Sequence, residues 1–143
     1  LGNTGGTVTF NSGINSDVVP AISSQYNLGS PNSKWKNIYA KNILLSSGEN
    51  DIVSGVVSTV TTVSYIDTTS PAVCTLPNPA SQEFGQIKII VASDLSSPVQ
   101  ITPTTSLGYT SFVLTNTGDS ITLMYANDIL GWVIINTFRA SVL

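Results

Sequence analysis

The feature that most constrains the fold is a succession of short β-patterned segments that fills residues 52–143. Each is rich in β-branched or alternating apolar residues and is bounded by turn formers such as Gly, Pro, Asn and Ser. The clearest, 120–126, alternates Ile121, Leu123 and Tyr125 with polar or smaller residues, as a half-buried strand does. The segments are 57–65, 72–76, 86–93, 99–102, 111–115, 120–126 and 132–138. They predict an all-β domain, an antiparallel β-sandwich or barrel-like unit.

Two of these segments, 86–93 and 132–138, are apolar on both faces. In the first, every second residue from Ile87 to Val91 can face the core, which leaves Ile90 on the opposite side. A sandwich of this length has one interior, so a second apolar face indicates contact with another subunit. A loop folded over that face is the alternative.

Residues 1–51 have a different character. They hold three of the four lysines and many turn formers, and their apolar stretches are as short as Val18-Val19. The one helix candidate is a single turn at 34–37, which Ser33 could cap. A segment of this kind is too short to bury a core and is usually stabilised by winding around partner chains. We therefore expect an extended shaft or neck segment at 1–51 and a β domain at 52–143.

The composition excludes several kinds of site. Histidine is absent, so the chain cannot form a catalytic Ser-His-Asp or Cys-His site or a zinc site that uses imidazole. Cys74 is the one cysteine, which excludes an intrachain disulfide framework. Arg139 is the one arginine, which excludes an arginine cluster that binds phosphate. A net charge of −3 argues against a nucleic-acid partner, and no apolar run is long enough for a membrane span. We expect no cofactor and no bound metal. Because the chain opens at Leu1 without a signal region, we expect a C-terminal fragment of a longer polypeptide.

Paired carboxylates are the remaining catalytic option. Glu49 and Asp51 form the tightest acidic pair, and Asp119 and Asp128 lie in predicted turns that could converge. Glycosidases use two carboxylates about 5 to 9 Å apart, and the same oxygens could hold a structural calcium ion. Yet all four residues also suit solvated connectors and turns. We therefore do not expect an enzyme.

A fifteen-residue stretch at 26–40 resembles a module of phage tail fibres and large-virus fibre proteins. In that module a tight turn containing glycine precedes a short aromatic element, and each chain of a threefold fibre lays its apolar cluster on its neighbours. The resemblance implies shaft packing between chains, with a hydrophobic staple inside one chain as the alternative. Gly29 permits the tight turn. The residues that we expect in the trimer contact are Tyr26, Leu28, Trp35, Ile38 and Tyr39.

A second pattern, of about sixty residues, is similar to the head domains that end many viral tail fibres and spikes. Its pieces are Thr75-Leu76-Pro77, Gly85, Lys88-Ile89-Ile90, Val99-Gln100-Ile101-Thr102-Pro103, Gly118-Asp119-Ser120-Ile121-Thr122-Leu123 and Gly131-Trp132-Val133-Ile134-Ile135. The resemblance implies an intertwined homotrimer with a slender shaft and a β head, displayed on the virion surface. The sequence has no helical self-cleaving chaperone domain such as closes some fibres.

For such a head, function concentrates on loops held by a rigid scaffold. The longest predicted loop, 103–111, carries Tyr109, an aromatic residue among hydroxyl-bearing neighbours. We expect Tyr109 and Phe112, with Asn127 and Asp128 of a second loop, to bind a host-cell surface receptor, either a glycan or a protein. Phe112 in the core and Tyr109 packed at its rim is the alternative.

The sequence therefore leaves three candidate functions. The first is attachment of a virion to its host through the head, with the rest of the fibre and two further copies of the chain as partners. The second is a purely structural domain that trimerises and caps a fibre or capsid protein. The third is a glycan-degrading spike domain.

Overall fold

The computed structural model describes residues 14–22, 25–30, 32–45, 47–48, 52–53, 55–67, 70–80 and 84–143. The chain divides into two compact units, Leu1–Lys41 and Asn42–Leu143. We predicted the division after residue 51, and residues 49–51 lie outside the described residues. We call the second unit the sandwich.

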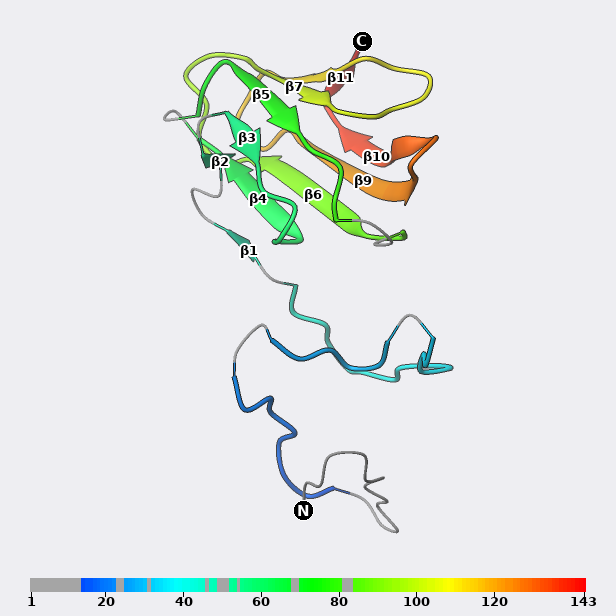
Figure 1. Ribbon diagram of the computed structural model, residues 1–143. Helices are drawn as coiled ribbons and strands as arrows, with labels where there is room; N and C mark the ends of the chain where they lie inside the picture. Colours follow the sequence, from blue (N-terminus) through cyan, green and yellow to red (C-terminus); the bar gives the residue numbers. More distant parts are fainter. Residues whose placement is uncertain are drawn as a thin grey trace. The chain divides into compact units, whose positions relative to one another are not determined.

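All regular structure in the described residues is β-strand, which confirms the all-β prediction. The strands are β1 (Ser47–Gly48), β2 (Ile52–Val53), β3 (Val56–Val57), β4 (Val63–Ile66), β5 (Val73–Leu76), β6 (Ile87–Ala92), β7 (Val99–Pro103), β8 (Phe112–Leu114), β9 (Ser120–Asn127), β10 (Gly131–Phe138) and β11 (Ser141–Val142). They form two layers, visible edge-on in Figure 1. The β6 sheet has the order β1-β4-β6-β9-β10 and the β7 sheet the order β11-β8-β7-β5-β3-β2.

The sheets are mixed, so the prediction of an antiparallel unit was wrong. From β3 to β7 each strand lies in the opposite sheet from the one before it, and strands two apart become neighbours pointing the same way. This gives the parallel pairs β3–β5, β4–β6 and β5–β7, and β1 pairs with β4 in the same sense. The barrel-like alternative was also wrong, because the sheets end in separate edge strands and stay open.

The core lies between the two sheets. In β9 the predicted alternation is confirmed, since Ile121, Leu123 and Tyr125 are buried while their neighbours are partly exposed. Residues of the facing β7 sheet, such as Ile101 and Phe112, complete the interior. Burying these apolar side chains is the main force that holds the sandwich together.

The face that β6 turns inward differs from the prediction. Lys88, Ile90 and Ala92 are buried, whereas the alternate residues Ile87, Ile89 and Val91 point outward. A lysine can occupy the interior at this position because its Nζ donates hydrogen bonds to the carbonyl oxygen of Thr61, at 2.8 Å, and to its Oγ1, at 3.2 Å. Its aliphatic stem then packs as an apolar side chain does.

The predicted strand at 57–65 is divided into β3 and β4. Residues 58–62 form the crossing from one sheet to the other, which a straight strand could not make. In β4 the buried residues are Ser64 and Ile66, while Val63 and Tyr65 are partly exposed on the outer face.

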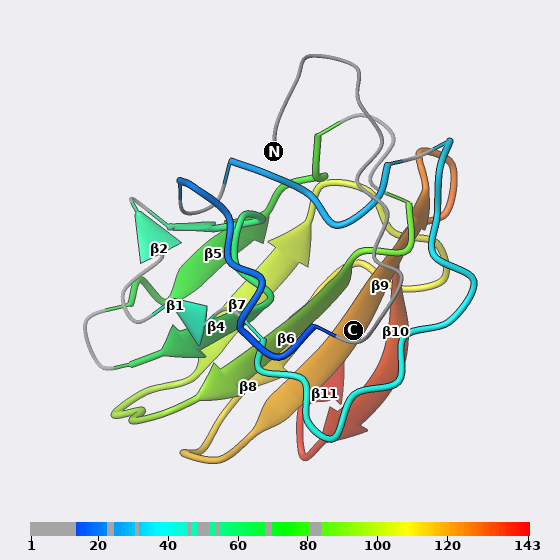
Figure 2. The same ribbon diagram turned by 90° about the horizontal axis from the view of Figure 1, so that it is seen from below.

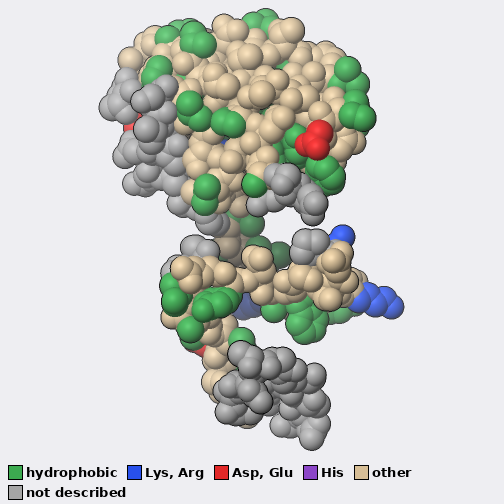
Figure 3. Space-filling model, in the orientation of Figure 1, with side chains coloured by type: hydrophobic (Ala, Val, Ile, Leu, Met, Phe, Trp, Pro, Cys, Tyr) green, Lys and Arg blue, Asp and Glu red, His purple; other side chains and the backbone are tan. Residues whose placement is uncertain are grey.

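In the first unit the predicted helical turn after Ser33 is absent. The backbone of Ser33 instead pairs with Ser30, N–H to carbonyl oxygen in both directions at 3.0 and 3.2 Å, and Ser30 Oγ accepts a further bond from Ser33 N. Gly29, at φ +95°, lies beside this turn. Every described side chain of 14–41 is exposed, and Figure 3 shows green apolar side chains and blue lysines on the surface of this unit.

Candidate functional site

Strand directions bring four connections to one end of the sandwich, which we call the Trp132 end. β3, β5, β7 and β9 finish there, and β4, β6, β8 and β10 begin there. Among the described residues, the connections are 58–62, 77–80 with 84–86, 104–111 and 128–130. In Figure 1 the yellow loop after β7 and the orange turn between β9 and β10 lie at this same end. The structure therefore places the two loops singled out in the sequence next to each other.

Backbone pairing fixes the 104–111 loop against the β9–β10 turn. Trp132 N donates to the carbonyl oxygen of Thr105 at 2.9 Å, and Ser106 forms a β-bridge with Gly131. From a third connection, Asn78 Nδ2 donates to Thr105 Oγ1 at 2.9 Å. Gly131 has φ +66°, and a Cβ at this position would lie 2.0 Å from the Thr105 oxygen. The close approach of the two backbones thus requires glycine.

Tyr109 holds the same loop from its other side. Its hydroxyl donates to the carbonyl oxygen of Trp132 at 2.8 Å, and Ser106 Oγ donates to the carbonyl oxygen of Tyr109 at 2.8 Å. Burial raises the pKa of Tyr109 to about 12, so the phenol stays neutral and keeps its proton for this bond. Tyr109 packs at the rim of the core with part of its ring exposed.

The other predicted binding residues divide between this end and the core. Asn127 Oδ1 accepts hydrogen bonds from Ile129 N at 2.9 Å and Leu130 N at 2.8 Å, which closes the turn. Asp128 Oδ1 accepts a bond from the buried Tyr125 hydroxyl at 2.7 Å. Phe112 is fully buried in the core, so its side chain is closed to a ligand.

Within the 104–111 loop and the β9–β10 turn, two exposed apolar side chains were not predicted from the sequence. Leu107 is 66% exposed at the tip of the 104–111 loop, and Ile129 is 83% exposed in the adjoining turn. The available signal was an apolar residue inside a turn motif: Leu107 precedes Gly108, and Ile129 follows Asn127-Asp128. Turn positions of this kind face solvent, so their side chains are free to contact a partner.

Asp119 and Asp128 do not form a catalytic pair. Asp119 precedes β9 and Asp128 follows it, so the two lie about 30 Å apart at the ends of the strand. The expectation that they could converge was wrong, because the strand between them is continuous. Glu49 and Asp51 lie outside the described residues.

Asp119 is a fully buried carboxylate that pairs with the half-exposed Arg139. Its Oδ1 lies 3.0 Å from Arg139 Nε, and its Oδ2 accepts bonds from Thr115 N at 2.8 Å and Asn116 N at 2.9 Å. Burial would raise the pKa of this carboxyl, but the two backbone N–H groups and the guanidinium together hold it below its usual value. We call the opposite end of the sandwich, where this pair lies, the Asp119 end.

Neither a metal-binding cluster of three side chains nor a helix that could span a membrane occurs among the described residues. Within them, no cluster of three Cys, Asp or Glu side chains is suited to a metal ion. The same part of the chain contains no helix of the length and apolarity needed to span a membrane.

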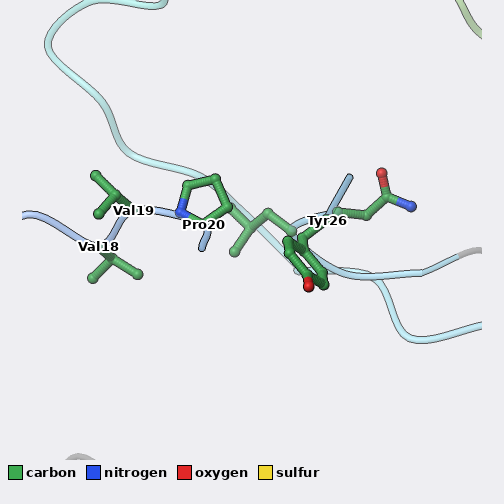
Figure 4. Close-up of a pocket in the computed structure, with 6 residues that line it drawn as sticks. Val18, Val19, Pro20 and Tyr26 are labelled. Atoms are coloured by element: carbon green, nitrogen blue, oxygen red, sulfur yellow. The ribbon is translucent and has the colours of Figure 1, made fainter. Parts of the chain in front are cut away.

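The predicted shaft residues lie exposed on a single copy of the chain. Trp35 is 62% exposed, and Tyr26, Leu28, Ile38 and Tyr39 are likewise exposed. An open cavity of about 350 Å³, shown in Figure 4, is lined by Val18, Val19, Pro20, Tyr26, Asn27 and Leu28. A second, of about 330 Å³, is lined by Gly29, Ser33, Lys34 and Trp35. Because these side chains bury little of one another, a staple within one chain does not satisfy them.

No model of a known protein family matches this sequence, and a comparison with curated proteins finds no significant similarity.

Proposed function

We propose that this chain is the end portion of a viral fibre, in which residues 14–45 associate with two further copies and the sandwich attaches to a receptor on the host cell. The observation that carries the proposal is the exposure of every described side chain of 14–45, a dozen of them large and apolar. Apolar surface of this extent in a segment without a core is stabilised by association. The number of copies comes from the resemblance to fibre proteins.

Association predicts that Trp35→Ala weakens assembly. Large aromatic residues at the centre of an interface contribute about 2 kcal/mol or more, so we expect the concentration for half-assembly to rise roughly thirty-fold. Sedimentation of the full chain across a concentration series measures this. Tyr39, the next aromatic residue of the motif, is 92% exposed in one copy. If assembly also buries Tyr39, Tyr39→Ser should raise the concentration for half-assembly too.

A wild-type chain that sediments at 15.0 kDa at every concentration contradicts the proposal. A Trp35→Ala chain that assembles as tightly as the parent places Trp35 outside the contact. Because Trp35 is exposed in a single copy, the melting of the sandwich serves as the control and should not change.

The proposed attachment surface consists of the 104–111 loop and the β9–β10 turn. Its backbone is fixed by Gly131 and Tyr109, so partner binding requires little ordering of the loop. The polar groups of Tyr109, Asn127 and Asp128 already bond within the protein. The exposed apolar side chains of these two segments, Leu107 and Ile129, are aliphatic and suit contact with a protein receptor. An exposed aromatic ring at the same end, Phe84, stacks on Tyr125 and offers a surface on which a sugar could stack.

We expect the double substitution Leu107→Ser with Ile129→Ser to lower cell binding at least ten-fold. A labelled full chain is applied to a panel of bacterial and eukaryotic cells, with a glycan array in parallel. The matched control is Val73→Ser, which removes an apolar side chain 63% exposed at the Asp119 end. Melting temperature and assembled mass should stay the same for both variants.

The structural cap remains the second candidate, because each predicted polar contact residue is engaged in the fold of its own loop. It predicts assembly without binding to any cell or glycan in that panel. Glycan binding that survives the double substitution contradicts the proposed attachment surface.

A further inference from the structure

The outer faces of the two sheets differ in chemistry. Pairing of β4 with β6, β6 with β9 and β9 with β10 sets one row of side chains outward across the β6 sheet. Figure 2 shows these four strands side by side. The outward residues, which we call the β6 face, are Val63, Tyr65, Ile87, Ile89, Val91, Ser120, Thr122, Met124, Val133, Asn136 and Phe138. Eight of the eleven are apolar or aromatic.

The corresponding outer face of the β7 sheet is more polar. Its outward residues in β3, β5, β7 and β8 are Val56, Val73, Thr75, Gln100, Thr102 and Val113, of which three are polar. Such a face suits contact with water, as one side of a sheet commonly does. The apolar character of the β6 face is therefore a property of that sheet and not of the sandwich as a whole.

The eleven residues of the β6 face are uncharged, and one charge lies at its edge: the guanidinium of the half-exposed Arg139 lies over the Phe138 ring, 5.0 Å from the ring centroid. The charged residue of β6 itself, Lys88, points into the core, where its amine donates to Thr61. Away from the Arg139 edge, a second β6 face can therefore approach without bringing like charges together or removing a charge from water. The β6 face of another copy carries the same uncharged mixture of Val, Ile, Thr and Met and therefore matches this face in chemistry.

We infer that the β6 face is the surface through which the sandwiches of neighbouring copies contact one another. This inference rests on the proposed self-association and adds its location in the sandwich. In an assembly of three copies, a β6 face turned towards the threefold axis contacts the same face of both neighbours, so one such face per chain is sufficient.

The size of the face fits a contact between copies that are already joined. Four strands about 4.8 Å apart, over five residues of about 3.3 Å each, cover roughly 300 Å² in projection. A stable interface between free proteins buries about 800 Å² on each partner. Joining through residues 14–45 raises the effective concentration of one sandwich near another, so a small face then suffices.

The topology agrees with this arrangement. The polypeptide enters the sandwich through β1, an edge strand of the same sheet. A connection through the preceding residues therefore attaches to the sheet that carries the β6 face. The first strand of the sandwich belongs to the β6 sheet, so the N-terminal segment does not connect directly to a strand of the β7 sheet.

The test compares two matched cysteine variants of the full chain. Thr122 lies mid-strand on the β6 face, opposite Ile89, and Thr102 lies mid-strand on the outer face of the β7 sheet. Both are threonines and both are partly exposed. Native Cys74 is buried, and burial raises the pKa of its thiol, so its own reaction with a thiol reagent is slow.

In the assembled protein we expect T122C to react with a soluble disulfide reagent at least ten-fold more slowly than T102C. Dilution below the assembly concentration should make the two rates equal. As a second measure, T122K should raise the concentration for half-assembly ten-fold or more, and T102K should leave it unchanged. Thermal melting confirms that each variant is folded.

Equal rates in the assembled protein show an open β6 face and overturn the inference, while assembly itself remains as proposed. Protection of T122C that persists in the dissociated chain means that the chain covers the face itself, which also overturns the inference. Failure of the proposed function is seen separately, as a wild-type chain that never assembles.

Discussion

Replacing Gly131 with alanine is expected to lower the free energy of unfolding of the sandwich by about 3 kcal/mol or more. A non-glycine residue at positive φ costs about 1–2 kcal/mol by itself. The new Cβ also meets the backbone of Thr105, at 2.0 Å from its oxygen and 2.3 Å from its carbonyl carbon. Backbone cannot swing aside as a side chain does, so the loop must move and its bond to Trp132 N is lost. Urea unfolding followed by Trp fluorescence measures the change.

Gly108→Ala is the matched control for this prediction. Gly108 lies in the same loop with φ +91°, yet a Cβ there would meet no atom within 4 Å. Gly108→Ala should therefore lower the free energy of unfolding only by the cost of a non-glycine residue at positive φ, about 1–2 kcal/mol. Equal losses in the two variants would mean that the contact between the loop and the turn contributes nothing to stability.

Asp119→Ala has the second large expected effect. The change removes the acceptor for the N–H groups of Thr115 and Asn116 and the partner of Arg139. A buried donor left without a partner costs about 1–3 kcal/mol, so two of them give a loss near 3 kcal/mol. Arg139 is half exposed, and water replaces its lost partner at little cost. The expected fall in melting temperature is about 10 °C or more.

Two further variants separate the contributions. Asp119→Asn keeps one acceptor oxygen and should lose less than Asp119→Ala. Asp94→Ala removes an exposed carboxylate at the same end of the sandwich and should change stability by less than about 0.5 kcal/mol. A loss in the Asp94 variant equal to that in Asp119→Ala would remove the special role assigned to the buried pair.

The same carboxylate sets the pH dependence of stability. Its pKa in the folded protein lies below the ordinary value of 3.8, so its contribution is fully present above that value and is lost as the pH falls through the folded pKa. The chain has no histidine, so we expect a level melting temperature between about pH 5.5 and 8. The parent should then lose stability below about pH 4, and Asp119→Ala should lose less over that interval.

The strands of the sandwich could be predicted from sequence because most of them alternate strictly. β9 is the clearest case, since Ile121, Leu123 and Tyr125 are apolar and their neighbours are not. Alternation failed in β6, where residues on both faces are apolar and the single charged residue, Lys88, occupies the interior. The acceptors that make this possible are on Thr61, 27 residues earlier. No local pattern contains that information.

Strand order could not be predicted for a related reason. The sequence marks where strands begin and end, but the step from one layer to the other at 58–62 depends on the whole core. The candidate loops were found because Gly, Asn and Asp mark turns locally. That Tyr109 holds its loop, through the carbonyl oxygen of a residue 23 positions away, depended on the tertiary structure.

The alternation of β3 to β7 between sheets also has a consequence for synthesis on the ribosome. Each of these strands pairs with an earlier strand of its sheet but gains its second neighbour only from a later one, and the β6 sheet is complete only when β10 has been made. Contacts so distant along the chain form slowly and together. A nascent chain that stops before Gly131 lacks Trp132, the largest side chain of the core, and we expect it not to reach the folded sandwich. Folding, and the assembly that depends on it, therefore distinguishes finished chains from interrupted ones.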